Sequence, residues 1–197
     1  MLYPILVFVA TAAWGVFHSW LAAFSTKQMA GKVFGKGIDR YYRLIFIGAA
    51  LLTLVPILAM VAFLPSRTLW VIPLPWRYLT LVIQLLALIG ILVTVFQTDL
   101  LAFAGIKQLS DPDAERKNRL TTRGVYGIVR HPMYLFSIIL FWLLPYITDL
   151  ILAFITAGTL YFLIGMIPEE RKLVEVYGEE YQRYQEDVSR IIPGLKR

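Results

Sequence analysis

The residues best suited to chemistry flank two apolar runs in the second half of the chain. Arg130 and His131 stand directly before Pro132, where one run begins. A cation and an imidazole at a helix start can hold an anionic ligand group, because helix N-termini also favour negative charge. Two adjacent carboxylates, Glu169 and Glu170, end the next run. Carboxylates at a membrane boundary are costly unless a cationic or hydrogen-bonding group meets them.

Each of these features also has a simpler interpretation. Arg130 can be an interface anchor whose stem lies in lipid and whose charge reaches water. The pair Glu169 and Glu170 can be the solvated start of a helix. If both sets of residues are functional instead, they must meet in one pocket on one side of the membrane.

The other of the two histidines, His18, lies in the middle of an otherwise apolar predicted span. An ionisable residue there is a functional candidate, either as a base that deprotonates a thiol or as a haem ligand. A neutral histidine that bonds to another helix is the alternative. The sequence has no metal-ligand spacing and no cysteine, which excludes disulfides, thiolate metal sites and a cysteine nucleophile.

The elements that position these residues are predicted to be membrane-spanning helices. The chain is 58% hydrophobic and only 16% charged, whereas about a quarter of residues in soluble domains are charged. Its apolar residues therefore need lipid as a solvent. We predict an all-α polytopic membrane protein, a single domain over 1–197, with five spans built on charge-free runs close to the required length of about 20 residues. These spans cover about 3–24, 44–65, 78–99, 132–148 and 150–168.

The basic residues predict the orientation. Of the 19 Lys and Arg residues, only Arg67 and Arg77 lie in the loop between the second and third predicted spans. All the others lie on the opposite side of the predicted membrane. The positive-inside rule then places the N-terminus outside and the C-terminus in the cytoplasm, in a bacterial or archaeal cell membrane. The net charge of +6 is better explained by anionic lipid headgroups than by nucleic acid, which we do not expect as a partner.

Polar segments on the cytoplasmic side are predicted at 107–134 and 169–193. In the second of these, apolar and aromatic residues recur at spacings of three and four, which predicts one amphipathic helix from Glu169 to Val188. A kink is expected where Pro168 joins it to the fifth span. The residues of the stripe are Leu173, Tyr177, Tyr181, Tyr184 and Val188.

Two motifs carry a resemblance to a known family. Gly124-Val125-Tyr126 precedes Arg130-His131-Pro132-x-Tyr134, and Glu169-Glu170-x-x-Leu173 is followed by Tyr177-Gly178-x-x-Tyr181-x-x-Tyr184. In this order the motifs resemble the isoprenylcysteine carboxyl methyltransferase superfamily over about 120–193. Phe141-Trp142-x-x-Pro145 and the segment from Gly165 to Leu173 resemble its methanethiol S-methyltransferase branch most.

The resemblance implies a membrane enzyme that transfers the methyl group of S-adenosylmethionine. It implies that Glu169 holds a polar group of the cofactor, with Glu170 beside it. Arg130 is suited to pair with the methionyl carboxylate through a charge-assisted bond. No G-x-G-x-x-G motif is present, which argues against a soluble Rossmann-type methyltransferase. The other cofactor-binding residues that the resemblance implies are Leu120, Thr121, Tyr126, His131, Pro132, Met133 and Tyr134.

One departure from the superfamily bears on the methyl acceptor. Prenylcysteine enzymes carry an arginine four residues before the cofactor-binding glutamate, and here that position is Gly165. This favours a small thiol as acceptor, with prenylcysteine carboxylate or a phospholipid amine as alternatives. A different class of function remains open, a non-enzymatic haem- or quinone-handling membrane subunit that uses His18.

Overall fold

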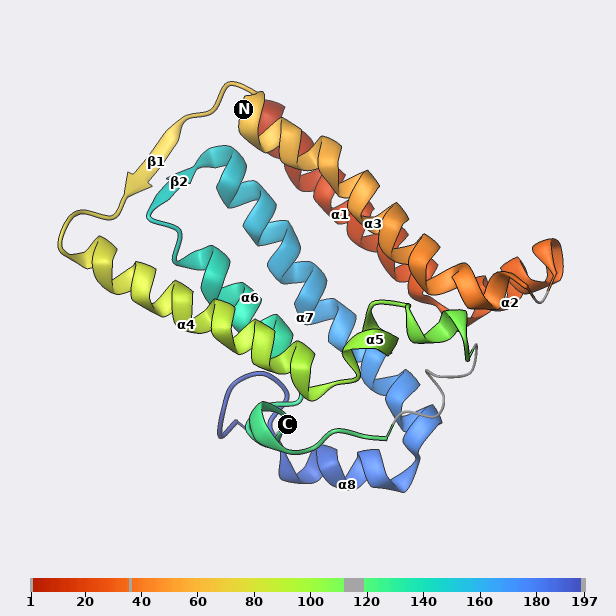
Figure 1. The fold of residues 1–197 in the computed structure, drawn as a ribbon. Coiled ribbons are helices and arrows are strands. Elements are labelled where there is room, and N and C mark those ends of the chain that lie inside the picture. Colours follow the sequence, from red (N-terminus) through yellow and green to blue (C-terminus); the bar gives the residue numbers. More distant parts are fainter. Residues whose placement is uncertain (1, 36, 112–118, 196–197) are drawn as a thin grey trace. The chain divides into compact units, whose positions relative to one another are not determined.

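The computed structural model describes residues 2–35, 37–111 and 119–195, which are mostly helical (Figure 1). The predicted element 107–134 is described except for 112–118, which lie outside the described residues. The helices are α1 Leu2–Ala22, α2 Phe24–Phe34, α3 Ile38–Phe63, α4 Trp76–Gln97, α5 Leu100–Phe103, η1 Lys107–Leu109, η2 Gly124–Gly127, α6 Pro132–Trp142, α7 Asp149–Tyr177 and α8 Glu179–Asp187. The strands are β1 Thr68–Val71 and β2 Tyr146–Thr148.

Four helices of the described chain, α1, α3, α4 and α7, are long and apolar enough to cross a membrane. The prediction of a helical integral membrane protein is confirmed, but five full-length spans are not observed. Helix α6 has 11 residues, which at about 1.5 Å per residue covers roughly half of a hydrocarbon core of about 30 Å. The remainder of the predicted span 132–148 forms a turn and strand β2.

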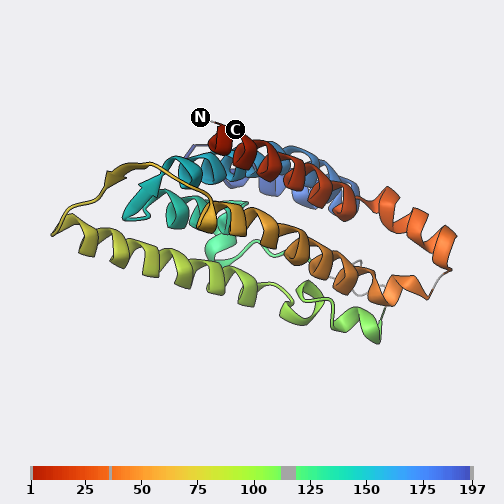
Figure 2. The ribbon, with the colours of Figure 1, turned by 90° about the horizontal axis from the view of Figure 1, so that it is seen from above.

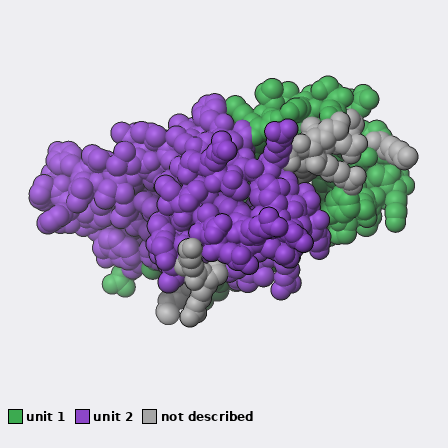
Figure 3. Space-filling model, turned by 90° about the horizontal axis from the view of Figure 1, so that it is seen from below, with its two compact units in different colours: residues 1–67, 99–118, 149–161 green, residues 68–98, 119–148, 162–197 purple. Residues whose placement is uncertain are grey.

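The chain packs into two compact units (Figure 3). Unit 1 contains residues 1–67, 99–118 and 149–161. Unit 2 contains residues 68–98, 119–148 and 162–197. Helix α7 is continuous and supplies its first part to unit 1 and its second part to unit 2.

In unit 1, α1 and α3 run side by side in opposite directions (Figures 1 and 2). The indole Nε1 of Trp14 donates to the carbonyl oxygen of Ala50 at 3.1 Å, and the hydroxyl of Tyr42 donates to that of Leu21 at 2.7 Å. A Cβ atom on Gly15 would lie 2.6 Å from the ring of Tyr161. Glycine therefore lets α7 approach α1 closely.

In unit 2, α4 packs along α6 (Figure 1). The amide of Gln84 donates to the carbonyl oxygen of Leu140 at 2.8 Å. The two strands pair antiparallel, with Trp70 opposite Ile147. The prediction of an all-α fold omitted this ribbon, whose β-branched and aromatic residues favour extended structure. The pairing joins the segment before α4 to the segment after α6.

The C-terminal region differs from the single amphipathic helix predicted over Glu169–Val188. Helix α7 continues through Pro168 and ends at Tyr177, and α8 begins after Gly178. Gly178 has a φ of 57° and a ψ of −132°, a conformation that glycine adopts without a Cβ clash. The predicted apolar stripe is therefore divided between two helices.

Candidate functional site

The centre of the site in unit 2 is the buried carboxylate of Glu170, which is 4% exposed. One oxygen accepts from Nε of Arg130 at 2.8 Å and lies 3.2 Å from Nε2 of His131. The other oxygen accepts from Nη2 of Arg190 at 2.8 Å and from the amide of Gln185 at 3.2 Å. Both oxygens are thus used within the protein, and this carboxylate holds α7, α6 and the C-terminal segment together.

The guanidinium of Arg130 is bound as fully as its carboxylate partner. Its side chain is 1% exposed. Besides the bond to Glu170, Nη1 donates to the carbonyl oxygens of Gln185, at 2.9 Å, and Val188. The main-chain N–H of Arg130 also donates to the carbonyl oxygen of Ser189 at 2.8 Å. In this arrangement Arg130 fastens the residues after α8 to the start of α6.

Glu169, the neighbour of Glu170, has different surroundings. Its side chain is 44% exposed. It accepts a hydrogen bond from the hydroxyl of Tyr134 at 2.6 Å, and Nδ1 of His131 lies 3.7 Å away. Glu169 is therefore an oriented carboxylate with an accessible face, which a ligand can approach.

An aromatic stack supports this carboxylate. The imidazole of His131 stacks on the ring of Tyr134, with centroids 5.3 Å apart and an interplanar angle of 7°. Tyr134 stacks in turn with Phe162 at 4.8 Å and 15°. His131 is 6% exposed, and its two nitrogens face the two glutamates. The stack fixes the direction from which Tyr134 bonds to Glu169.

The loop segment before α6 is fixed by a close approach of its backbone to α4. Gly124 has a φ of 65°. A Cβ atom at this position would lie 2.1 Å from the side-chain amide of Gln97. The side-chain oxygen of Gln97 accepts from the N–H of Val125 at 3.1 Å.

Gly124→Ala is expected to destabilise this turn, because the added methyl group meets Gln97 and the positive φ disfavours a side chain. The expected cost is about 1–3 kcal/mol of stability, with faster proteolysis of the loop in detergent-purified protein. Gly127→Ala is the matched control, since its Cβ would come no closer than 3.4 Å to another atom. Equal protease sensitivity of the two variants would contradict this account.

Three tyrosines near the glutamates stay protonated. The hydroxyl of Tyr184 donates to the carbonyl oxygen of Tyr126 at 2.6 Å. Burial raises the pKa of Tyr126 and that of Tyr184 to about 12. The negative charge of Glu169 adds to the increase in the pKa of Tyr126. Burial also raises the pKa of Tyr181. At neutral pH these hydroxyls are hydrogen-bond donors, not bases.

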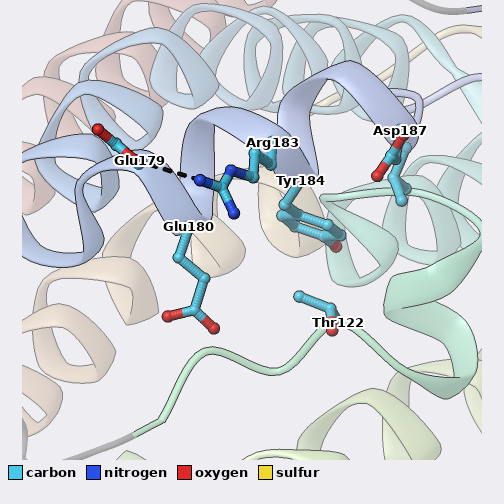
Figure 4. A pocket seen from close by; sticks show the side chains of 7 residues that line it. Thr122, Glu179, Glu180, Arg183, Tyr184 and Asp187 are labelled. Atoms are coloured by element: carbon cyan, nitrogen blue, oxygen red, sulfur yellow. Dashed lines mark hydrogen bonds and ion pairs between the residues drawn. The ribbon is translucent and has the colours of Figure 1, made fainter.

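A groove of about 550 Å³ lies between α8 and the segment around Thr122. Figure 4 shows the carboxylate of Glu180 extending toward that segment, while Glu179 pairs with Arg183. Tyr184 is part of the wall. The complete lining consists of Thr122, Glu179, Glu180, Arg183, Tyr184, Asp187 and Val188.

The remaining predicted site residues of unit 2 lie in the segment before Thr122 and in the first turn of α6. Leu120 and Thr121 are half-buried and directly precede Thr122 of the groove. Pro132 is fully buried in the first turn of α6, where its fixed φ suits a helix start. Met133 follows it and is half-buried. The predicted cofactor residues from Leu120 to Tyr134 therefore belong to one unit together with Glu169 and Glu170.

His18 belongs to unit 1. It is not in the middle of its helix, as expected from the sequence, but about one turn before the end of α1 at Ala22. Its atom Nδ1 is buried and has no hydrogen-bond partner within the part of the chain that the structure describes. The predicted bond to another helix is therefore not observed at this nitrogen.

Three polar residues of the site were not among the predicted ones. Arg190 and Gln185 bind Glu170, and Gln97 supports the loop at Gly124. Gln97 could have been predicted as a site residue, because it is a polar residue in the last turn of an apolar helix. Arg190 lies on an irregular segment after α8, where spacing gives no information about contacts.

Comparison with known proteins places this geometry in a family. A model of the family described as phospholipid methyltransferase matches residues 79–180. The chain belongs to the phospholipid methyltransferase family. The matched segment contains η2, α6, the aromatic stack and both glutamates of the site.

Individual relatives of this phospholipid methyltransferase family member are methanethiol S-methyltransferases. The one from Pseudomonas deceptionensis is 39% identical over 110 residues, which are 54% of this chain and 42% of the relative. Methanethiol S-methyltransferase 1 from Bradyrhizobium diazoefficiens is 41% identical over 75 residues, 38% of this chain and 26% of the relative. That from Mycobacterium tuberculosis is 36% identical over 73 residues, 37% of this chain and 30% of the relative.

These matches confirm the resemblance to the methanethiol S-methyltransferase branch, and they give no support to a haem- or quinone-handling subunit. The chain spans less than half the length of these relatives. No solved structure matches it significantly.

Proposed function

We propose that this chain is an integral membrane methyltransferase that uses S-adenosylmethionine as methyl donor and a small thiol as acceptor. The observation that carries the proposal is the exposed carboxylate of Glu169, oriented by Tyr134 and His131 within the segment that matches the family. The names of the methanethiol S-methyltransferase relatives support the choice of a thiol acceptor. Prenylcysteine carboxylates and phospholipid amines are the competing acceptors.

The residues of unit 2 fit the proposed donor chemically. S-adenosylmethionine carries a positive sulfonium and ammonium group together with polar ribose hydroxyls. The exposed oxygen atoms of Glu169 and the carboxylates of Glu179, Glu180 and Asp187 along the groove suit these groups. We propose that Leu120, Thr121 and Tyr126 line the adenosyl part, and that His131, Pro132, Met133 and Tyr134 form the wall beside it.

Arg130 and Glu170 fit a positioning role better than contact with the donor. Both side chains are almost fully buried and are bonded to each other and to the C-terminal segment. An arginine committed in this way would have to leave Glu170 before it could bind a methionyl carboxylate. We therefore propose that the pair holds His131 in place, that His131 in turn orients Glu169, and that Glu169 faces the donor.

The bound donor supplies an activated methyl group whose leaving group is a neutral thioether. The protein then needs to align this group with the acceptor and to exclude water more than it needs acid–base chemistry at the donor. A rigid stack of His131, Tyr134 and Phe162 behind Glu169 provides such alignment. The neutral tyrosine hydroxyls of the site can bond to the ribose or adenine without competing as nucleophiles.

A methyl-transfer screen tests the proposed function. The protein in lipid nanodiscs would receive S-adenosylmethionine with a labelled methyl group and, separately, methanethiol, longer thiols, a prenylcysteine analogue and phosphatidylethanolamine. We expect label in the thioether product of methanethiol. Binding of the donor without transfer to any thiol would overturn the choice of acceptor, and absence of both binding and transfer would overturn the enzyme.

Gly165→Arg tests the acceptor class from the protein side. A Cβ atom at Gly165 would have no other heavy atom within 4 Å, so the variant should fold. By resemblance to prenylcysteine enzymes, the new guanidinium should bind a carboxylate, and such a bond is worth about 1.5–3 kcal/mol. We expect a prenylcysteine analogue to inhibit thiol methylation at least tenfold more strongly in this variant than in Gly165→Gln. Equal inhibition of both would contradict the proposal.

We further propose that the chain crosses the membrane five times, with the N-terminus outside and the C-terminus in the cytoplasm. The pairing of β1 with β2 in unit 2 supports this topology. It brings the end of α6 to the start of α4, so that α6 and the residues up to β2 complete the short fourth crossing. The scarcity of Lys and Arg around β1, where only Arg67 and Arg77 occur, is consistent with an outer face.

Single cysteines test this topology, because the natural chain has none. Ser66→Cys, Tyr146→Cys and Glu186→Cys are all at exposed positions. An impermeant maleimide applied to intact cells should label the first two, and the third only after the membrane is opened. If the maleimide labels Ser66→Cys but not Tyr146→Cys in intact cells, the residues after α6 do not reach the outer face.

A further inference from the structure

Unit 1 contains a histidine enclosed by aromatic rings from three helices. The imidazole of His18 on α1 lies 5.0 Å from the ring of Trp14, also on α1. It lies 4.8 Å from Phe46 on α3 and 6.0 Å from Tyr161 on α7, to which it is perpendicular. The hydroxyl of Ser19 donates to that of Tyr161 at 3.4 Å. The imidazole is half-buried, and aromatic rings form much of its surroundings.

Within this cage, Nδ1 of His18 has no hydrogen-bond partner among the residues that the structure describes. A buried polar atom without a partner destabilises the folded protein, and native proteins rarely leave one unsatisfied without a functional reason. A histidine that served only packing would be expected to bond to a backbone carbonyl or a side chain. The open nitrogen instead suits a ligand that brings one acidic proton.

A cation lies next to this cage. The guanidinium carbon of Arg43 is 5.4 Å from the centroid of Phe46, the ring that His18 also contacts. Nε of Arg43 donates to the carbonyl oxygen of Phe103 at 3.2 Å. A Cβ atom on Gly105 would lie 3.0 Å from the side chain of Arg43. The backbone of the turn after α5 therefore packs closely against this arginine and restricts its movement. A fixed guanidinium stabilises a developing anion.

We propose that this group is the site where the acceptor thiol is bound and loses its proton, an inference that rests on the proposed function. The S–H bond breaks, the proton moves to Nδ1 of His18, and the electron pair stays on sulfur as a thiolate beside Arg43. The rings of Trp14, Phe46 and Tyr161 favour a short apolar thiol, because most of the surface that they offer is apolar. The product of this step is the nucleophile that methyl transfer requires.

The chain's two histidines allow a direct test that needs no methyl donor. Protein with 15N-labelled histidine in nanodiscs would be titrated with ethanethiol, and His131→Gln assigns the two sets of ring signals. We expect a saturable shift of the His18 ring nitrogens and none at His131. Ethyl methyl sulfide, which lacks the S–H proton, should leave the His18 signals in place. No shift at His18, or equal shifts with thiol and thioether, would overturn the site.

His18→Gln provides the functional arm of the test. It should lower the rate of thiol methylation at neutral pH roughly 100-fold or more, as loss of a general base does. The rate should then rise about tenfold per pH unit, because the variant depends on thiolate formed in solution. A wild-type rate with a wild-type pH profile would overturn the inference.

Binding of S-adenosylhomocysteine separates this outcome from failure of the proposed function. His18→Gln should retain it, which also shows that the variant is folded. If the wild-type protein does not bind the donor product, the proposed function fails, while the ethanethiol titration still decides whether His18 receives a thiol proton.

Discussion

Glu170→Gln is expected to destabilise the protein by about 3–5 kcal/mol, the cost of removing one partner of a buried ion pair. The carboxylate is 4% exposed and receives bonds from Arg130 and Arg190. Glutamine keeps the shape but loses the charge, so the guanidinium of Arg130 stays buried without an anionic partner. The segment after α8 should detach, and donor binding should be lost with it.

The measurement is thermal unfolding and limited proteolysis of the purified protein in nanodiscs. Glu169→Gln is the matched control, because it makes the same change at the adjacent and largely exposed carboxylate. The control should unfold within a few degrees of wild type. Wild-type stability and intact protection of the C-terminal segment in Glu170→Gln would show that this carboxylate does not hold the site together.

Glu169→Ala is expected to raise the KM for S-adenosylmethionine at least tenfold, a loss of about 1.4 kcal/mol or more. The protein should keep its fold, because the Glu169 side chain is 44% exposed. Tyr134→Phe should give a smaller loss, since it removes only the hydroxyl that orients the carboxylate. His131→Ala should match the tenfold loss and also reduce stability through its contact with Glu170.

Steady-state kinetics with methanethiol as acceptor check this order of effects. A pure loss of donor contact predicts that KM changes more than kcat in Glu169→Ala. Unchanged donor KM in both Glu169→Ala and His131→Ala would place the donor elsewhere on the chain.

The membrane helices could be predicted from the absence of charge over long runs, and four of the five predicted spans are full-length helices. The remaining predicted span, 132–148, is not a full-length helix, because hydropathy reports how many residues are apolar and not how many are helical. Leu143 and Leu144 are as apolar as a helix requires, yet the chain turns there to pair β2 with β1. Strand pairing between distant segments leaves no local periodic signal.

The candidate site was predictable in its location but not in the division of its roles. If Arg130, His131 and the two glutamates are all functional, they must share one pocket, and the structure brings these residues together in unit 2. Two adjacent glutamates look alike in sequence. They differ because one faces Arg190 and Gln185 from a distant segment and the other faces the surface. That difference arises only from tertiary contacts.

Calorimetric titration of the nanodisc-embedded protein with S-adenosylhomocysteine tests most directly whether unit 2 holds the methyl donor at Glu169. We predict saturable binding to the wild-type protein, and at least tenfold weaker binding to a Glu169→Ala variant that unfolds at the wild-type temperature. Absence of binding to folded wild-type protein, or equal affinity in the two proteins, would contradict the account.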